Sequence, residues 1–391
     1  MRLDRRELLR LSMLGGGALA MGPAFWKEAY AAPAQPGPSP YGAISGSPDV
    51  NGVRLPAGFT SRIVARSGQV VRNTSYTWPG APDGGACFPV STGGWVYVAN
   101  SELGSGTGGA SAIRFDGGGA IVGAYRILGN TNRNCAGGPT PWGTWLSCEE
   151  VAGGRVWECN PQQASQGTVR GLLGTFNHEA VAVDPVGKRL YLTEDTTSGR
   201  FYRFIPSAYP SLTAGQLQAA KINGNPLGGT GTLTWVNCAS TSPASAQSTV
   251  AANTSVFNGG EGCWYDSGVI YFTTKGDNRV WAHTPSTGAL EVIYDDGLYA
   301  GSPLTGVDNV TVSRSGDLYV AEDGGNQEIC IITPGPSRVV APFIKLEGHT
   351  ASEVTGPAFS PDGRRLYFSS QRGTSGTVGG GITFEVSGPF R

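Results

Sequence analysis

Polar side chains that could hold metal ions recur at two fixed places in this sequence of 391 residues. One place lies 10–14 positions before a repeated aromatic residue, and the other lies 3–5 positions after it. The early group is Asp83, Cys135, Glu179, Glu261, Asp308 and Glu353, and the late group includes Asn100, Glu102, Glu149, Glu150, Glu194, Asp195, Glu322, Asp323 and Arg372. Carboxylates that meet at one point raise one another's pKa values unless cations compensate their charge. If the fold gathers these side chains, their chemistry predicts bound metal.

The donor types narrow the choice of metal. Carboxylate-rich oxygen sites favour Ca²⁺ or Fe³⁺ over Zn²⁺. The three histidines, His178, His283 and His349, are too few for an imidazole-based zinc site, and we predict a structural role for His178. A cysteine is ordinarily a buried structural residue, but Cys135 is in phase with the acids, which favours a thiolate metal ligand.

A lone acidic residue at a strand end is ordinarily a solvated turn residue. This interpretation stays open above all for Asp83, Glu102, Glu149 and Glu158. The repeat phase favours metal binding for Glu150, Glu179, Glu194, Glu261, Asp308 and Glu322.

The aromatic residue marks a strand that recurs six times: WVYVANSE (95–102), TWLSCEE (144–150), RLYLTED (189–195), VIYFTTK (269–275), DLYVAED (317–323) and RLYFSSQ (365–371). The spacings are 48, 46, 80, 48 and 48 residues between Tyr97, Trp145, Tyr191, Tyr271, Tyr319 and Tyr367. A period in the forties, built from short strands and glycine-bearing turns, is typical of propeller blades. We therefore predict an all-β, six-bladed β-propeller with four-stranded blades.

The propeller would place both polar groups together. Two antiparallel strands joined by a tight turn bring the start of the first near the end of the second, so both groups should surround one mouth of a central channel. Residues 205–255 are predicted to be an inserted loop, and the segments 59–68 and 381–389 to close the ring in one blade. A parallel β-solenoid and a propeller of five or seven blades remain the alternatives.

The first residues predict export. Arg5 and Arg6 precede a short apolar stretch and the small-residue pattern of Ala29 and Ala31, as in a twin-arginine signal peptide. We expect residues 1–31 to be removed and residues 32–391 to form a single propeller domain. The protein would be secreted or periplasmic, would use the twin-arginine export machinery, would keep no membrane anchor, and would be a monomer.

Charge and cysteine content exclude some classes of function. The chain has 28 Lys and Arg against 29 Asp and Glu, and cleavage after Ala31 would leave 23 against 26, so nucleic-acid binding is not expected. Seven cysteines leave at least one unpaired within the chain, and Cys148 and Cys159 could bridge neighbouring strands.

Several of these segments, taken together, resemble the PhoX-type alkaline phosphatases. The segments that carry the resemblance occur in order along the chain: GGACFPVSTGGWVYVANSE (84–102), NCAGGPTPWGTWLSCEE (134–150), FNHEAVAVDP (176–185), YLTEDTTSGRFYRFIP (191–206), NGGEGCWYDSGVIYFTT (258–274), GVDNVTVSRSGDLYVAEDG (306–324) and SEVTGPAFSPDGRRLYFSS (352–370).

The resemblance implies a six-bladed propeller and a cluster of Fe³⁺ and Ca²⁺ with a cysteine thiolate among the iron ligands. Cys135 matches that cysteine. The matching carboxylates are Glu150, Glu179, Glu194, Glu261, Asp308 and Glu322, with Asp195, Asn309 and Asp323 as secondary candidates. The implied substrate is a small phosphate monoester, and Arg200 and Arg372 are candidate contacts for its phosphate or leaving group.

Two departures from the family pattern bear on function. The chain is shorter than the longer bacterial members, and TEDTTSGRFYRF replaces the usual aspartate-glycine run after TED, which affects Asp195. A calcium-dependent propeller lactonase or esterase and a non-catalytic, calcium-stabilised binding module are the alternative functions. Neither needs a thiolate ligand.

Overall fold

The computed structural model describes residues 32–238 and 253–391, and almost all of its regular structure is β-strand. The predicted signal peptide, residues 1–31, lies outside this description. In residues 32–238 and 253–391, no helix has the length and apolar character needed to cross a membrane.

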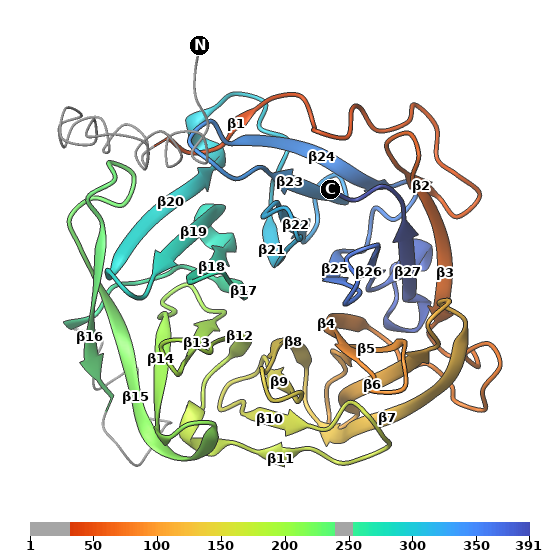
Figure 1. The fold of residues 1–391 in the computed structure, drawn as a ribbon, viewed down its shortest axis with the longest axis horizontal. Helices are drawn as coiled ribbons and strands as arrows, with labels where there is room; N and C mark the ends of the chain where they lie inside the picture. The colour runs from red at the N-terminus through yellow and green to blue at the C-terminus, as the bar shows by residue number, and fades with distance from the viewer. Residues whose placement is uncertain (1–31, 239–252) are drawn as a thin grey trace, which may run out of the picture.

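The strands surround a central axis, as Figure 1 shows. Six of them lie innermost, and each contacts the next around the ring. These inner strands are β4 (Pro82–Pro89), β8 (Asn134–Pro139), β12 (His178–Asp184), β17 (Gly260–Asp266), β21 (Val307–Val312) and β25 (Val354–Phe359). Each pairs antiparallel with the next strand along the chain: β5 (Trp95–Ser101), β9 (Trp145–Glu149), β13 (Arg189–Glu194), β18 (Val269–Thr274), β22 (Leu318–Glu322) and β26 (Arg365–Ser370).

The remaining strands lie farther out. They are β6 (Gly108–Phe115), β7 (Ile121–Thr131), β10 (Val156–Cys159), β11 (Thr168–Val169), β14 (Tyr202–Ala208), β15 (Ser211–Asn223), β16 (Thr232–Asn237), β19 (Arg279–Thr284), β20 (Ala289–Asp295), β23 (Glu328–Ile332), β24 (Val339–Leu346), β27 (Ile382–Ser387) and β3 (Thr60–Arg66). Two short strands, β1 (Gln35–Pro36) and β2 (Val53–Arg54), pair with β24.

These pairings confirm an all-β, propeller-like fold, but they do not divide it into six separate four-stranded sheets. Three sheets have four strands, one has six, and one has nine, in the order β12-β13-β14-β15-β16-β20-β19-β18-β17. The nine-stranded sheet arises because β16 pairs with β15 and also touches β20 at Thr232 and Ala289.

The segment 205–255, predicted to be an inserted loop, contains β15 and β16 in its described part. Its small polar composition resembles a loop, yet β15 has a hydrogen-bonding partner on each side, β14 and β16. Leu212, Leu217 and Ala219 of β15 are buried. Pairing and burial therefore make this segment extended.

The first and last parts of the chain close the ring. β3 pairs antiparallel with β27, with Thr60 opposite Ser387 and Arg66 opposite Ile382. This is the closure that segments 59–68 and 381–389 predict, and it leaves no free edge between the two chain ends.

The repeated aromatic residues form much of the packing between sheets. Tyr97 of β5 stacks on Tyr367 of β26, in the neighbouring sheet, with ring centroids 4.9 Å apart. Both side chains are fully buried. An aromatic pair of this kind contributes about 1 kcal/mol beyond the area that it buries. The aromatic residue that recurs in the sequence therefore helps to hold these two neighbouring sheets together.

Glycines allow the inner strands to approach closely. A Cβ atom on Gly84 would lie 2.5 Å from the Cα of Ala136, and one on Gly262 would lie 2.6 Å from the backbone nitrogen of Val310. Larger residues at these positions would push neighbouring inner strands apart. The close approach brings the side chains at the strand starts to one narrow region.

All seven cysteines are free, so the suggested Cys148–Cys159 disulfide is wrong. The strand register explains why, since Cys148 lies opposite Val156 and Cys159 lies opposite Trp145. The two sulfurs therefore belong to different cross-strand pairs of the same sheet.

Candidate metal centre

A β-bulge interrupts the pairing of every inner strand near its start. In five strands the bulged pair begins with a member of the early polar group: Asp83, Cys135, Glu179, Glu261 or Asp308. In β25 the bulge falls later, between Thr355 and Ala358, and Glu353 directly precedes the strand. Bulges bend a strand and redirect a side chain, so they turn these groups away from the regular ladder.

The redirected groups meet in three clusters, and within each cluster the possible ligand atoms lie within 4.8 Å of one another. The clusters are Cys135, Glu150 and Glu179; Asp83, Glu102 and Glu353; and Glu179, Glu261 and Asp308. Glu179 belongs to two of them. The structure therefore brings together five of the predicted metal ligands, Cys135, Glu150, Glu179, Glu261 and Asp308, with Asp83, Glu102 and Glu353.

Burial makes this arrangement costly without cations. Glu179 is fully buried, and neither of its carboxylate oxygens has a hydrogen-bond partner among the described residues. Burial, reinforced by Glu261 and Glu150, raises the pKa of Glu179 well above its ordinary value. Bound cations would reverse this effect by stabilising the charged carboxylates, so the donor set fits a metal centre.

The same physical causes act on other members. Burial followed by Glu102 raises the pKa of Asp83 to about 8. Burial, Glu102 and Glu261 raise the pKa of Glu150 to about 9. Burial and then Asp83 raise the pKa of Glu353 to about 10. Each of these three acids thus holds its proton more firmly, first because it is buried and then because other acids are near.

Cys135 also lies in a negative environment. Burial, and then Asp83 and Glu179, raise the pKa of its thiol well above the ordinary value. Only a bound cation would favour the thiolate here, because the described neighbours that shift its pKa are acids. The position thus suits a metal ligand better than a free nucleophile.

Two of the acids at strand ends accept hydrogen bonds from nearby protein groups and do not join a cluster among the described residues. Glu194 accepts hydrogen bonds from the Arg200 backbone N–H (3.0 Å) and the Tyr202 hydroxyl (2.9 Å). Glu322 accepts them from the backbone N–H groups of Thr305 (2.7 Å) and Glu328 (3.0 Å). The structure does not bring Glu194 or Glu322 into the three clusters of described residues; both carboxylates hold neighbouring loops.

The next residue along the chain points differently, as alternation along a strand requires. Glu150 follows Glu149 and enters a cluster, whereas the Glu149 carboxylate accepts hydrogen bonds from the backbone of Asn132 and Arg155. Asp195 and Asp323 follow Glu194 and Glu322, and both pair with Lys275, at 3.9 and 3.1 Å.

The sequence interpretation omitted Lys275, as it omitted Gln371, which donates to Asp83 and Glu102. Lys275 Nζ also lies 2.8 Å from Glu261 Oε1. A signal was present, because Lys275 follows Tyr271 by the same four positions that separate Asp195 from Tyr191 and Asp323 from Tyr319.

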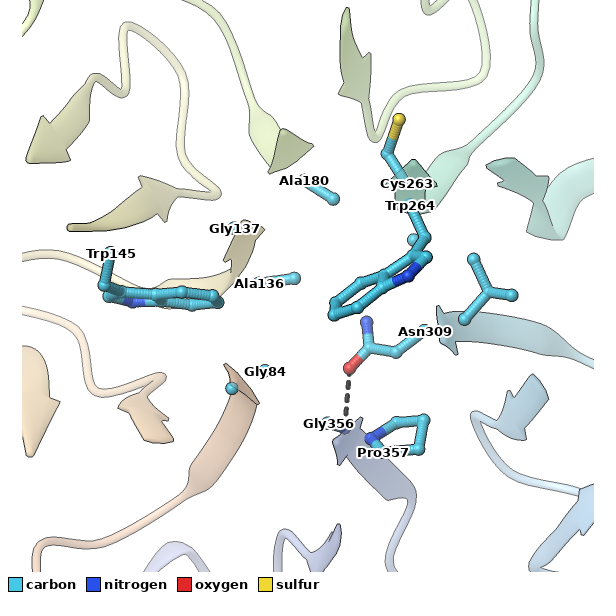
Figure 2. A pocket seen from close by; sticks show the side chains of 13 residues that line it. Gly84, Ala136, Gly137, Trp145, Ala180, Cys263, Trp264, Asn309, Gly356 and Pro357 are labelled. Carbon is cyan, nitrogen blue, oxygen red and sulfur yellow. Dashed lines mark hydrogen bonds between the residues drawn. The ribbon is translucent and has the colours of Figure 1, made fainter. Parts of the chain in front are cut away.

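Asn309 positions its neighbours. Its side chain donates to Asp308 Oδ1 (2.8 Å) and accepts from the backbone N–H of Gly356 (2.7 Å), which links β21 to β25. Figure 2 shows the latter bond beside a small pocket lined by residues of all six inner strands, into which the Trp264 indole extends.

The two predicted arginines lie in different surroundings. Arg372 Nη2 lies 2.8 Å from Glu353 Oε1, and its side chain is 35% exposed. Arg200 is buried, and its guanidinium donates to Thr254 Oγ1 (2.9 Å) and to the backbone carbonyls of Ser198 and Gly199. Arg372 therefore borders a cluster, whereas these bonds tie the Arg200 side chain to adjacent loops.

Comparisons with known proteins identify a matching sequence family and similar solved structures. The sequence model for "Alkaline phosphatase PhoX" matches residues 120–156 and 152–373. The structure of Pseudomonas fluorescens PhoX in complex with vanadate, a transition state analogue, is similar, with a TM-score of 0.70 and 15% identity over 92% of this chain and 98% of that one. A gluconolactonase from Xanthomonas campestris is less similar, with a TM-score of 0.45 and 14% identity over 92% of this chain and 98% of that one. No protein with a curated function matches the sequence significantly.

Proposed function

Because this chain belongs to the PhoX alkaline phosphatase family, we propose that it hydrolyses small phosphate monoesters at a metal centre formed by the three clusters. The observation that carries this proposal is the convergence of buried and half-buried carboxylates and one thiol, contributed by five inner strands, by the residue before β25 and by the residues that follow β5 and β9. A fold of this kind serves many functions, so the donor set is the specific support.

The donor types suggest where each metal would bind. Cys135, Glu150 and Glu179 combine a thiol with carboxylates, which suits Fe³⁺. The other two clusters offer only oxygen atoms, which suits Ca²⁺. When bound, the metal ions would supply the positive charge and Lewis acidity that phosphate-ester hydrolysis requires.

The chain's own residues would orient this centre and the substrate. Gln371 donates to Asp83 Oδ2 (2.6 Å) and Glu102 Oε2 (2.8 Å), which fixes two carboxylates of one cluster. Arg372, half-exposed beside Glu353, could turn toward the phosphate group of a bound ester. Arg200, whose guanidinium is bonded to adjacent loops, is only a candidate contact for the leaving group.

We interpret the nine-stranded sheet as two blades, β12–β15 and β17–β20, joined through β16, which gives six blades in all. We further propose twin-arginine export of a monomer to the periplasm or the medium, with residues 32–391 as one domain.

Elemental analysis and a rate measurement test the function. The purified mature protein should contain both iron and calcium and should hydrolyse p-nitrophenyl phosphate at alkaline pH. Calcium without iron, together with hydrolysis of lactones but not of phosphates, would instead favour the lactonase. Bound calcium with neither activity would favour a binding module.

A cysteine variant tests the thiolate ligand. Cys135→Ser should lose iron and phosphatase activity and keep its far-UV circular dichroism, because the serine hydroxyl is a poor ligand for iron. Cys87→Ser, a change on β4 outside the three clusters, is the matched control. Full iron content and turnover in Cys135→Ser would show that the thiol is structural.

A further inference from the structure

Lys275 occupies an unusual position in the ring. It directly follows β18, at the place where the other second strands are followed by Glu102, Glu150, Asp195, Asp323 and Gln371. Five of the six positions thus offer an oxygen donor, and the sixth offers an ammonium group. An ammonium cannot bind a metal ion, so Lys275 must act there as a charge or as a hydrogen-bond donor.

The Lys275 ammonium lies among carboxylates from three different sheet segments. Its Nζ is 2.8 Å from Glu261 Oε1, 3.1 Å from Asp323 Oδ2 and 3.9 Å from Asp195 Oδ2. Glu261 begins the bulge of β17, Asp195 follows β13, and Asp323 follows β22. Three acids converge on one point, and that point already holds a positive charge.

The distances from Lys275 Nζ to the carboxylate oxygens are those of an ammonium group that pairs with carboxylates. Charge-assisted N–H···O contacts are about 2.7–2.9 Å long, and two of the three contacts lie at or near this range. The Lys275 side chain is 34% exposed, whereas Glu261 is 3% exposed. The ammonium of this partly exposed side chain therefore compensates a buried carboxylate, and removing it would leave that charge uncompensated.

We propose that Lys275 takes the place of one metal ion at the point between Asp195, Glu261 and Asp323, while Glu261 remains a member of its cluster with Glu179 and Asp308. Metal ions would then bind only at the three clusters described above. The inference rests on the proposed metal centre for the rest of the mouth, and it limits the number of ions that the centre accepts.

Counting bound calcium tests this inference without an activity assay. Lys275→Gln removes the charge and leaves three carboxylates without a counter-ion, so the variant should bind one more Ca²⁺ per chain than the wild type. Lys275→Arg keeps the charge and should match the wild type. The full mature proteins are equilibrated with calcium chloride, separated from free ions by gel filtration, and analysed by mass spectrometry for metals and by circular dichroism for folding.

An equal or lower calcium count in Lys275→Gln would overturn the inference. If that variant does not fold, Asp195→Asn in the wild-type background decides the question, because its carboxylate is partly exposed and pairs at only 3.9 Å. We expect an unchanged calcium count, and the loss of one Ca²⁺ would mean that a metal does bind there. Wild-type protein without phosphatase activity would contradict the proposed function and leave the calcium counts interpretable.

Discussion

Glu179 shows how burial makes one residue depend on a cation. Its side chain is fully buried, its carboxylate oxygens lack hydrogen-bond partners among the described residues, and it belongs to two clusters. An unpaired buried charge is among the most costly groups in a protein. Without metal, burial therefore favours the protonated form of Glu179; with metal, the carboxylate could serve as a shared ligand.

This dependence predicts a large effect of Glu179→Gln. The amide cannot supply the negative charge, so the variant should lose bound metal and at least about 100-fold in phosphatase rate, since even indirect partners of a metal can cost 10–100-fold. Metal content and the rate on p-nitrophenyl phosphate measure this. Glu347→Gln, a change at an exposed ion pair with Arg54, should alter neither. A Glu179→Gln protein with normal metal content would contradict the role of Glu179 as a ligand.

At the scale of elements, the inner strands combine two devices: a bulge that redirects a polar side chain and small residues that permit close contact. Gly262 lies in the bulge of β17, directly after Glu261, and faces the backbone of β21. The same short segment thus presents a ligand and sets the spacing between neighbouring inner strands. Packing and metal binding are therefore coupled in these strands.

The coupling predicts that Gly262→Ala weakens both. Its Cβ would lie 2.6 Å from the Val310 nitrogen, and overpacking of this kind costs about 1 to 3 kcal/mol. We expect a lower melting temperature and weaker calcium binding. Gly46→Ala, at a position with no heavy atom within 4 Å of the new Cβ, should leave both nearly unchanged. Wild-type calcium affinity in Gly262→Ala would separate strand spacing from the site.

The sequence allowed the recurring strands, the ring closure and the gathering of the early group of polar residues to be predicted, because these depend on a local pattern repeated at a constant period. It did not reveal which of two consecutive acids turns toward the axis. Glu194 and Glu322 are engaged by backbone N–H groups of neighbouring loops, and those contacts join residues whose proximity only the folded loops create. β15 and β16 were missed because the segment 205–255 as a whole is rich in small polar residues, although β16 itself contains Leu233, Trp235 and Val236 and is ordered by pairing with β15.

At the scale of the whole molecule, the gathered acids tie stability to pH. In the folded state, burial and neighbouring acids raise the pKa of Asp83 to about 8 and that of Glu150 to about 9. The folded metal-free protein therefore binds more protons than the unfolded chain between about pH 4.5 and 9, and its stability must fall as the pH rises through this window.

Thermal unfolding of chelated protein measures this effect. The melting temperature should be lower at pH 9 than at pH 5 by about 5 °C or more. Protein loaded with metal should show a smaller or opposite change, because metal binding requires deprotonated ligands. A chelated protein that becomes more stable between pH 5 and 9 would show that these acids are ionised without metal.

The cluster of Asp83, Glu102 and Glu353 joins two neighbouring sheets, because Asp83 lies in β4, Glu102 follows β5 and Glu353 precedes β25, which contacts β4. Two of its members come from the first part of the chain and the third lies near the end, so a ribosome must finish nearly the entire polypeptide before this cluster can exist. Partly synthesised chains consequently lack this cluster, and an ion bound there under the proposed function would be taken up only after translation.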